Sequence, residues 1–184
     1  FQSEITQGDE ALKNENFDKA KQHYTKANLI KPASSVVAMK MNELSGAVKK
    51  KEENTRAYTK YITDGKTAFT AGKNEEAVRN FSAAVQLNPS STEAQTLLSE
   101  AEKKIAEIAK SKEDQYNTSI LKADNYLSTQ QFDAAINEYQ KASNLFPDKE
   151  YPRTKITEAK TTQAKVKADL DEKAFQEKLT NGDK

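Results

Sequence analysis

Residues 8–32 read GDEALKNENFDKAKQHYTKANLIKP, and the rest of the chain repeats the spacing of their small, aromatic and proline residues. The first copy has Gly8, Ala20, Tyr24, Ala27 and Pro32; the second has Gly65, Ala77, Phe81, Ala84 and Pro89; the third has Ala123, Ala135, Tyr139, Ala142 and Pro147. The copies are 57 and then 58 residues apart. A repeat of this length is typical of a stacked helical array and not of a single enzyme core.

Each copy predicts two helices joined by a short polar turn. The first helix is expected to end near Lys13, Thr70 and Ser128, and the second to end just before the proline, which cannot continue a helix. The small residues allow the two helices to approach closely, and the aromatic residue fills the space between them. No stretch alternates polar and apolar residues with period two, so strands are not expected.

These residues resemble the tetratricopeptide repeat, a helix-turn-helix unit of about 34 residues. The five offsets match in all three copies, with Ala123 in place of glycine in the third. The aromatic residue of that family at the start of the second helix is present as Phe17 and Phe132, whereas the second copy has Asn74 there. The resemblance implies a fold, because the motif of this family is structural.

The repeat is about 23 residues longer than that unit, and the extra residues also predict helix. They occupy Ser35 to Arg56, Thr92 to Gln115 and Pro152 to Lys173. Their apolar stripes are Val37, Met41, Leu44 and Val48; Leu98, Ala101, Ile105 and Ile108; and Ile156, Ala159 and Val166. We expect one continuous helix from about Ser35 to Gly72 and another from about Thr92 to Thr129. Each would pack on the preceding hairpin, cross a polar middle and become the first helix of the next.

The predicted fold is therefore all-α, with three hairpins linked by long continuous helices in an extended α-solenoid-like array. The expected units are residues 1–57, 58–115 and 116–174, with residues 175–184 beginning a fourth. Five of nine residues are identical between Phe1–Asp9 and Phe175–Asp183. This match predicts that the chain is part of a longer array. Long-period repeats of this kind resemble those of bacterial cell-envelope proteins, a resemblance that favours a periplasmic or cell-envelope location over a cytoplasmic one without deciding between them.

Composition and motifs argue against catalysis. The 29 basic and 28 acidic residues nearly balance, which gives no reason to expect a nucleic-acid partner. Cysteine is absent, and no apolar run is long enough to span a membrane. No phosphate-binding loop, nucleophile motif or set of metal ligands is apparent. The single histidine, His23, is expected on the surface. The sequence thus predicts no enzyme, no metal and no cofactor.

What remains is a surface for a protein or peptide partner, although the partner itself is not predicted. In the repeat family one side of the first helix lines a concave face that takes peptides. The resemblance places these candidate partner-binding residues there: Ile5, Asp9, Leu12, Ile62, Lys66, Phe69, Ile120, Asp124 and Leu127. The alternative is that they pack on the chain's own helices. The lysine and asparagine set that grips a carboxyl terminus in some members of the family is absent, since isoleucine stands at its lysine position.

Two functions follow from these expectations. The first is a non-catalytic scaffold that docks or spaces partner proteins. The second is a structural spacer, stalk or self-assembling envelope component without a dedicated ligand groove. Self-association is left open by both.

Overall fold

The computed structural model describes residues 1–182, and all regular structure in that range is helical. The helices are α1 (Gln2–Lys13), α2 (Phe17–Ile30), α3 (Ser35–Thr70), α4 (Asn74–Leu87), α5 (Thr92–Ser128), α6 (Phe132–Leu145) and α7 (Glu150–Gly182). The predicted all-α fold is confirmed, and neighbouring helices pack in sequence. The predicted helix ends at Lys13, Thr70 and Ser128 are also confirmed, and α2, α4 and α6 each end two residues before a proline.

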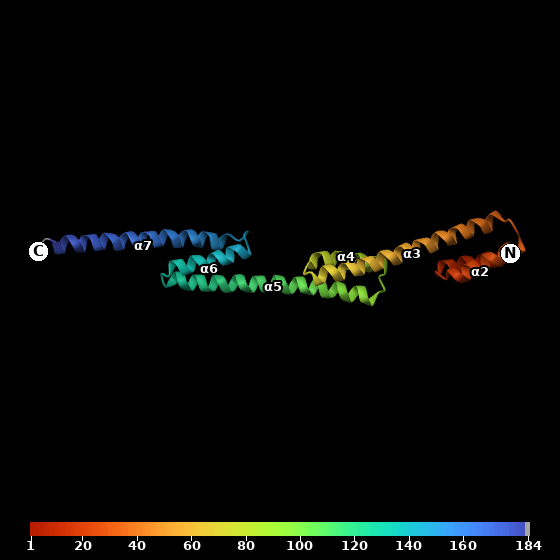
Figure 1. Ribbon diagram of the computed structural model, residues 1–184, viewed down its shortest axis with the longest axis horizontal. Helices are drawn as coiled ribbons and strands as arrows, with labels where there is room; N and C mark the ends of the chain where they lie inside the picture. The colour runs from red at the N-terminus through yellow and green to blue at the C-terminus, as the bar shows by residue number, and fades with distance from the viewer. Residues whose placement is uncertain (183–184) are drawn as a thin grey trace. The chain divides into compact units, whose positions relative to one another are not determined.

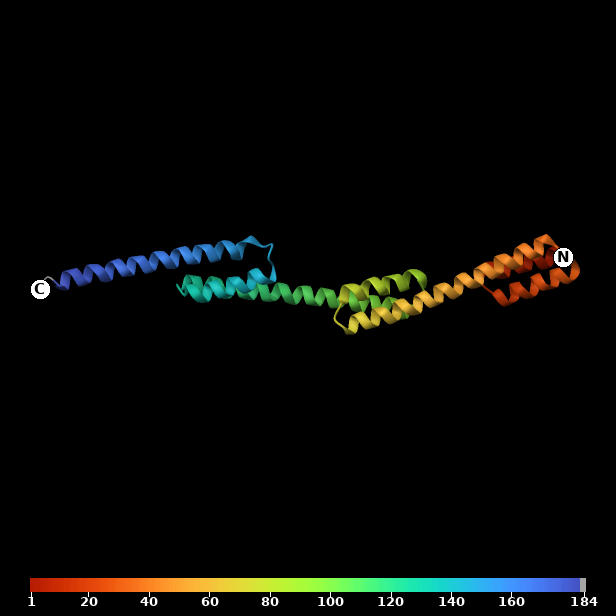
Figure 2. The ribbon, with the colours of Figure 1, turned by 45° about the horizontal axis from the view of Figure 1, so that its top comes forward.

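Residue contacts divide the chain into two units, Phe1–Lys103 and Lys104–Lys184, which are described separately. In the first unit α1 and α2 form a hairpin, and the first part of α3 packs on it. The last part of α3 pairs with α4, and the beginning of α5 adds Ala94 and Ala101 to their core. Figure 1 shows α3 beside α2 at one end and beside α4 at the other, and Figure 2 shows the same pairing from a second direction.

The core of each hairpin is built from the repeated residues. The two alanines of α2, Ala20 and Ala27, and the aromatic Tyr24 between them have no exposed surface. Gly8 of α1 lies directly under the ring of Tyr24, and a Cβ atom at Gly8 would lie 2.6 Å from Cδ1 of that ring. Gly65 lies under Phe81 in the same way. The glycines are therefore needed for close approach of the two helices. The prolines, by contrast, are exposed at the ends of the hairpins.

In the second unit the later part of α5 pairs with α6, and the beginning of α7 packs on α6. Ala123, Ala135 and Tyr139 form the buried cluster, with Ile156 of α7 packed against it. Pro152 is fully buried although it lies in α7. It occupies the first turn of the helix, where proline removes no intrahelical hydrogen bond.

The continuous helices predicted from Ser35 and from Thr92 are confirmed as α3 and α5. Nearly all side chains of the polar middle of α3, Lys49–Arg56, are exposed. One expectation about the apolar stripes is wrong: the side chain of Ile108 is 50% exposed. The 14 residues of α4 span only ~21 Å. The helix α5 starts at Thr92, beside the C-terminal end of α4, and passes the N-terminal end of α4 before it reaches Ile108.

The turns between paired helices share one backbone feature. Glu15, Gly72 and Gln130 occupy the same repeat position and have φ angles of 54°, 74° and 60°. Such a left-handed residue ends a helix and satisfies its last carbonyl groups. The following backbone NH groups do so here: those of Asn16, Lys73 and Gln131 donate to the carbonyls of Ala11, Ala68 and Tyr126.

Candidate functional site

The structure places the apolar candidate partner-binding residues within or against the hairpin cores. Ile5 and Ile62 are buried, with 3% and 7% of their surface exposed. The other four, Leu12, Phe69, Ile120 and Leu127, are half-buried and pack against the same clusters. This arrangement favours the alternative in which the apolar side of the first helix packs on the chain's own helices. In two hairpins the isoleucine offers a partner almost no surface.

The candidate aspartates accept hydrogen bonds from the buried tyrosines. The hydroxyl of Tyr24 donates a hydrogen bond of 2.7 Å to Asp9, and that of Tyr139 donates one of 2.5 Å to Asp124. Burial raises the pKa of both tyrosine phenols, and the hydrogen bonds to the aspartates raise it further. The phenols therefore stay protonated and keep donating at neutral pH. Asp9 and Asp124 thus position the core aromatics of their hairpins.

The two aspartates also contact side chains of the linking helices, a lysine in the first hairpin and a second tyrosine in the third. Lys40 of α3 lies 3.1 Å from Asp9 and 3.0 Å from Glu43. The hydrogen bonds to Glu43 and Asp9 raise the pKa of Lys40. In the third hairpin Tyr151 of α7 donates to Asp124 at 3.0 Å. Each linking helix is thereby tied to the first helix of the hairpin on which it packs.

The second hairpin reverses the charge. It has Lys66 where the others have aspartate, and Phe81 where they have tyrosine. Lys66 pairs instead with Glu93 of α5 at 2.7 Å, and this hydrogen bond holds the pKa of Glu93 below its ordinary value. Lys66 also remains 51% exposed. Of the candidate residues of this hairpin, it is therefore the one that a partner can reach most easily.

His23, which the sequence places on the surface, is partly covered by α1. Its side chain is 22% exposed, and Nδ1 lies 2.7 Å from a carboxylate oxygen of Glu4. This hydrogen bond lowers the pKa of Glu4. Because the pair joins α2 to α1, His23 has a packing role within the hairpin.

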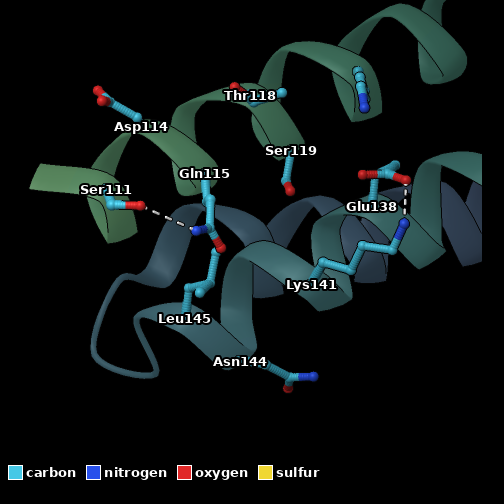
Figure 3. A pocket seen from close by; sticks show the side chains of 10 residues that line it. Ser111, Asp114, Gln115, Thr118, Ser119, Glu138, Lys141, Asn144 and Leu145 are labelled. Atoms are coloured by element: carbon cyan, nitrogen blue, oxygen red, sulfur yellow. Dashed lines mark hydrogen bonds and ion pairs between the residues drawn. The ribbon is translucent and has the colours of Figure 1, made fainter. Parts of the chain in front are cut away.

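A groove lies between α5 and α6 in the second unit (Figure 3). Its volume is about 650 Å³, and nine of its ten lining residues are polar or charged. Ser119 and Gln115 of α5 point toward α6, and Lys141 of α6 pairs with Glu138 at 2.5 Å. Leu145 of α6 is the one apolar residue of the lining. Hydroxyl, amide and charged groups of both signs would suit an extended polar segment of a partner.

A second surface was missed by the sequence analysis. Four large apolar side chains near the α2–α3 turn are exposed: Leu29 by 76%, Ile30 by 58%, Val36 by 41% and Met39 by 51%. The signal was available, because the second copy has Gln86, Glu93 and Thr96 where the first has Leu29, Val36 and Met39. At the positions of Leu29 and Met39 the other two copies have polar residues, so this surface is more apolar on the first hairpin than on the others.

An aromatic and cationic cluster supports the start of the third hairpin. The rings of Tyr116 and Phe146 pack edge to face with centroids 5.4 Å apart. Lys149 Nζ lies 4.0 Å from the Tyr116 centroid and pairs with Glu113 at 2.7 Å. These contacts join α5 to the turn that leads into α7. Phe1 and Tyr58 occupy the repeat position of Tyr116 in the other hairpins.

Within residues 1–182 no three or more acidic or histidine side chains gather in a way that could hold a metal ion. None of the described helices combines the length and apolarity that crossing a bilayer requires.

Paired antiparallel helices that repeat along the chain, each with a small-residue and aromatic contact between them, define a helical repeat protein. Two segments, residues 63–102 and 116–149, match models of the tetratricopeptide repeat. Residues 63–149 therefore contain tetratricopeptide repeats, a class of module that generally acts as a protein-interaction scaffold. No curated protein matches this chain.

Proposed function

We propose that this protein is a non-catalytic scaffold whose hairpins dock partner proteins and whose linking helices set the spacing between docking sites. The observation that carries the proposal is the continuity of α3, which packs on one hairpin and then forms the first helix of the next. One unbroken helix of 36 residues fixes where the second hairpin begins. In this proposal the repeating units remain residues 1–57, 58–115 and 116–174.

The α5–α6 groove is the proposed docking site for an extended polar segment. Its lining includes Lys122, Lys141, Glu138 and Asp114, so a segment that carries both charges could pair along it. Within the same unit as the groove, the half-buried Asp124 would offer a further charged contact on the first helix of the hairpin. Partner binding by the buried Ile5 and Ile62 would require the hairpin to open, and we do not include these two residues in the docking surface.

A capture experiment with matched variants tests the proposal. The full chain is immobilised and exposed to an extract of its source cells, and bound proteins are compared with those retained by Lys122→Glu/Lys141→Glu. The control is Lys103→Glu/Lys104→Glu, which makes the same charge change at exposed positions outside the groove. A partner lost with the groove variant and retained by the control supports docking. The absence of any partner that distinguishes the two variants would contradict it.

The second candidate function is a structural spacer, in which the long helices serve reach and stiffness alone. The exposed polar middle of α3 favours this function. Ion pairs such as Lys49–Glu53 form along the segment, and such pairs stabilise a helix without a partner. Spin labels at Leu29 and Thr70 would give one narrow distance distribution if α3 is rigid. Two inserted glycines after Lys50 should broaden it. An envelope location stays a prediction, for which cell fractionation is the test.

A further inference from the structure

The three hairpins differ at one pair of facing positions. The first helix of each hairpin carries Glu4, Tyr61 or Ser119 there, and the second helix carries His23, Asn80 or Glu138, in each case 19 residues later. In the first hairpin the two side chains meet, since His23 Nδ1 lies 2.7 Å from a carboxylate oxygen of Glu4. Figure 3 shows that Ser119 likewise points from α5 toward α6. This position of the first helix therefore faces the second helix.

The third hairpin lacks a charged pair between these two helices at this position. Ser119 and Glu138 both line the α5–α6 groove. The side chain of Glu138 is only 14% exposed, and among the described residues its ion pair is with Lys141 of its own helix, at 2.5 Å. The carboxylate thus stands where the first hairpin has His23, and a short hydroxyl stands where the first hairpin has the opposite charge.

We propose that the α5–α6 groove binds an arginine side chain of the partner segment, with its guanidinium group against Glu138. This inference rests on the proposed docking function of the groove and names the residue that the groove recognises. A carboxylate with little exposure to water favours charge-assisted hydrogen bonds, and a guanidinium group offers two parallel N–H groups that fit its two oxygens.

Two other residues of the lining can accept the remaining N–H groups of the guanidinium. Ser119 offers its hydroxyl oxygen. Gln115 donates a hydrogen bond of 3.3 Å from its amide nitrogen to Ser111, which leaves its amide oxygen as an acceptor. A lysine ammonium is a compact point charge and would engage fewer of these groups. The set of acceptors therefore favours arginine over lysine.

Lys141 competes with the arginine for Glu138. Its side chain is 64% exposed, and an exposed pair between residues three apart on a helix contributes little, so its ammonium group is easily displaced. Lys141→Met should tighten binding of an arginine probe about two- to fivefold. Lys122→Met is the control, because it removes the same charge from the same groove outside the Glu138 pair. Equal gains in the two variants would show that the groove responds to net charge alone, and would overturn the proposal.

The probe is N-acetyl-arginine methylamide, and the corresponding citrulline compound is its neutral isostere. Each is titrated at low salt into the isotope-labelled full chain and followed by NMR. The arginine probe should shift the amide signals around Ser119 and Glu138, and citrulline should bind about tenfold more weakly because it lacks the charge. Glu138→Gln should abolish this preference. Glu107→Gln, which removes an exposed carboxylate elsewhere on α5, should leave it unchanged. Equal binding of the two probes, or a preference that survives Glu138→Gln, overturns the proposal.

The capture experiment separates this inference from the docking function. A partner that is lost with Lys122→Glu/Lys141→Glu and also with Glu138→Gln supports both. A partner that is lost with the lysine variant but retained by Glu138→Gln leaves docking in place and overturns the arginine assignment. If no partner distinguishes the lysine variant from its control, the docking function is contradicted, and the probe titration still decides whether the groove recognises a guanidinium group.

Discussion

The hydroxyl of Tyr24 donates a 2.7 Å hydrogen bond to Asp9, and this contact explains a coordinated change along the repeat. The third hairpin has the same pair, Tyr139 and Asp124. The second hairpin has Phe81 and Lys66 at these positions. A phenol buried between two helices needs an acceptor, whereas a phenylalanine ring does not. Once the hydroxyl is absent, the position facing it is free to carry a cation.

We expect Tyr24→Phe to destabilise the first unit by about 1 kcal/mol, the net value of one hydrogen bond. The loss should be modest because Asp9 keeps its contact with Lys40 at 3.1 Å. Asp9→Leu should cost more, because it leaves the buried hydroxyl without an acceptor. Urea unfolding followed by circular dichroism measures both. Equal losses in the two variants would show that the hydroxyl finds another acceptor.

The glycines under the aromatic rings give a second prediction. Gly8→Ala should destabilise the first hairpin by about 1–3 kcal/mol, because its Cβ atom would overlap the ring of Tyr24. Gly46→Ala is the matched control. Gly46 is also within a helix, but no neighbouring atom lies within 4 Å of the place that its Cβ would take, so alanine should stabilise α3 by about 0.5–1 kcal/mol. Urea unfolding of both variants should therefore shift in opposite directions.

The sequence was sufficient for the helices because their boundaries depend on local chemistry. A proline follows each second helix, and no proline interrupts the segment from Ser35 to Thr70. The exposure of Ile108 could not be predicted in this way. Its apolar spacing continues that of Ala101, and only the length of the neighbouring α4 decides where the covering surface ends.

The candidate site was less predictable for a related reason. The spacing grouped Asp9 with Ile5 on one side of a helix, but it could not say which helix covers that side. The pairing of Asp9 with Tyr24 joins residues 15 apart in sequence, and the one signal for it was the joint change to Lys66 and Phe81. The apolar surface at Leu29 and Met39 was missed because the prediction rested on offsets that all copies share, whereas these two positions differ between copies.

The hairpin turns give a third prediction. Glu15 has a φ of 54°, a conformation that costs a residue with a side chain more than it costs glycine, and the second hairpin has Gly72 at this position. Glu15→Gly should stabilise the first hairpin by about 0.5–1 kcal/mol, and Gly72→Ala should destabilise the second by about 1 kcal/mol. Hydrogen exchange of amides in α2 and α4 would report the two effects separately. A destabilising Glu15→Gly would indicate that its ion pair with Lys51, at 2.5 Å, outweighs the backbone conformation.

The Lys66–Glu93 contact predicts how the first unit responds to acid. The hydrogen bond from Lys66 lowers the pKa of Glu93 from its ordinary value of about 4.5, so the unfolded chain takes up the proton more readily than the folded one. The stabilisation is therefore full above pH about 4.5 and is lost as the pH falls below that value. Glu93→Gln should flatten this part of the stability profile, and Lys66→Met should flatten it equally because it removes the same contact from the other side. Urea midpoints measured at neutral and acidic pH test this, and an acid response that persists in either variant would assign it to other carboxylates.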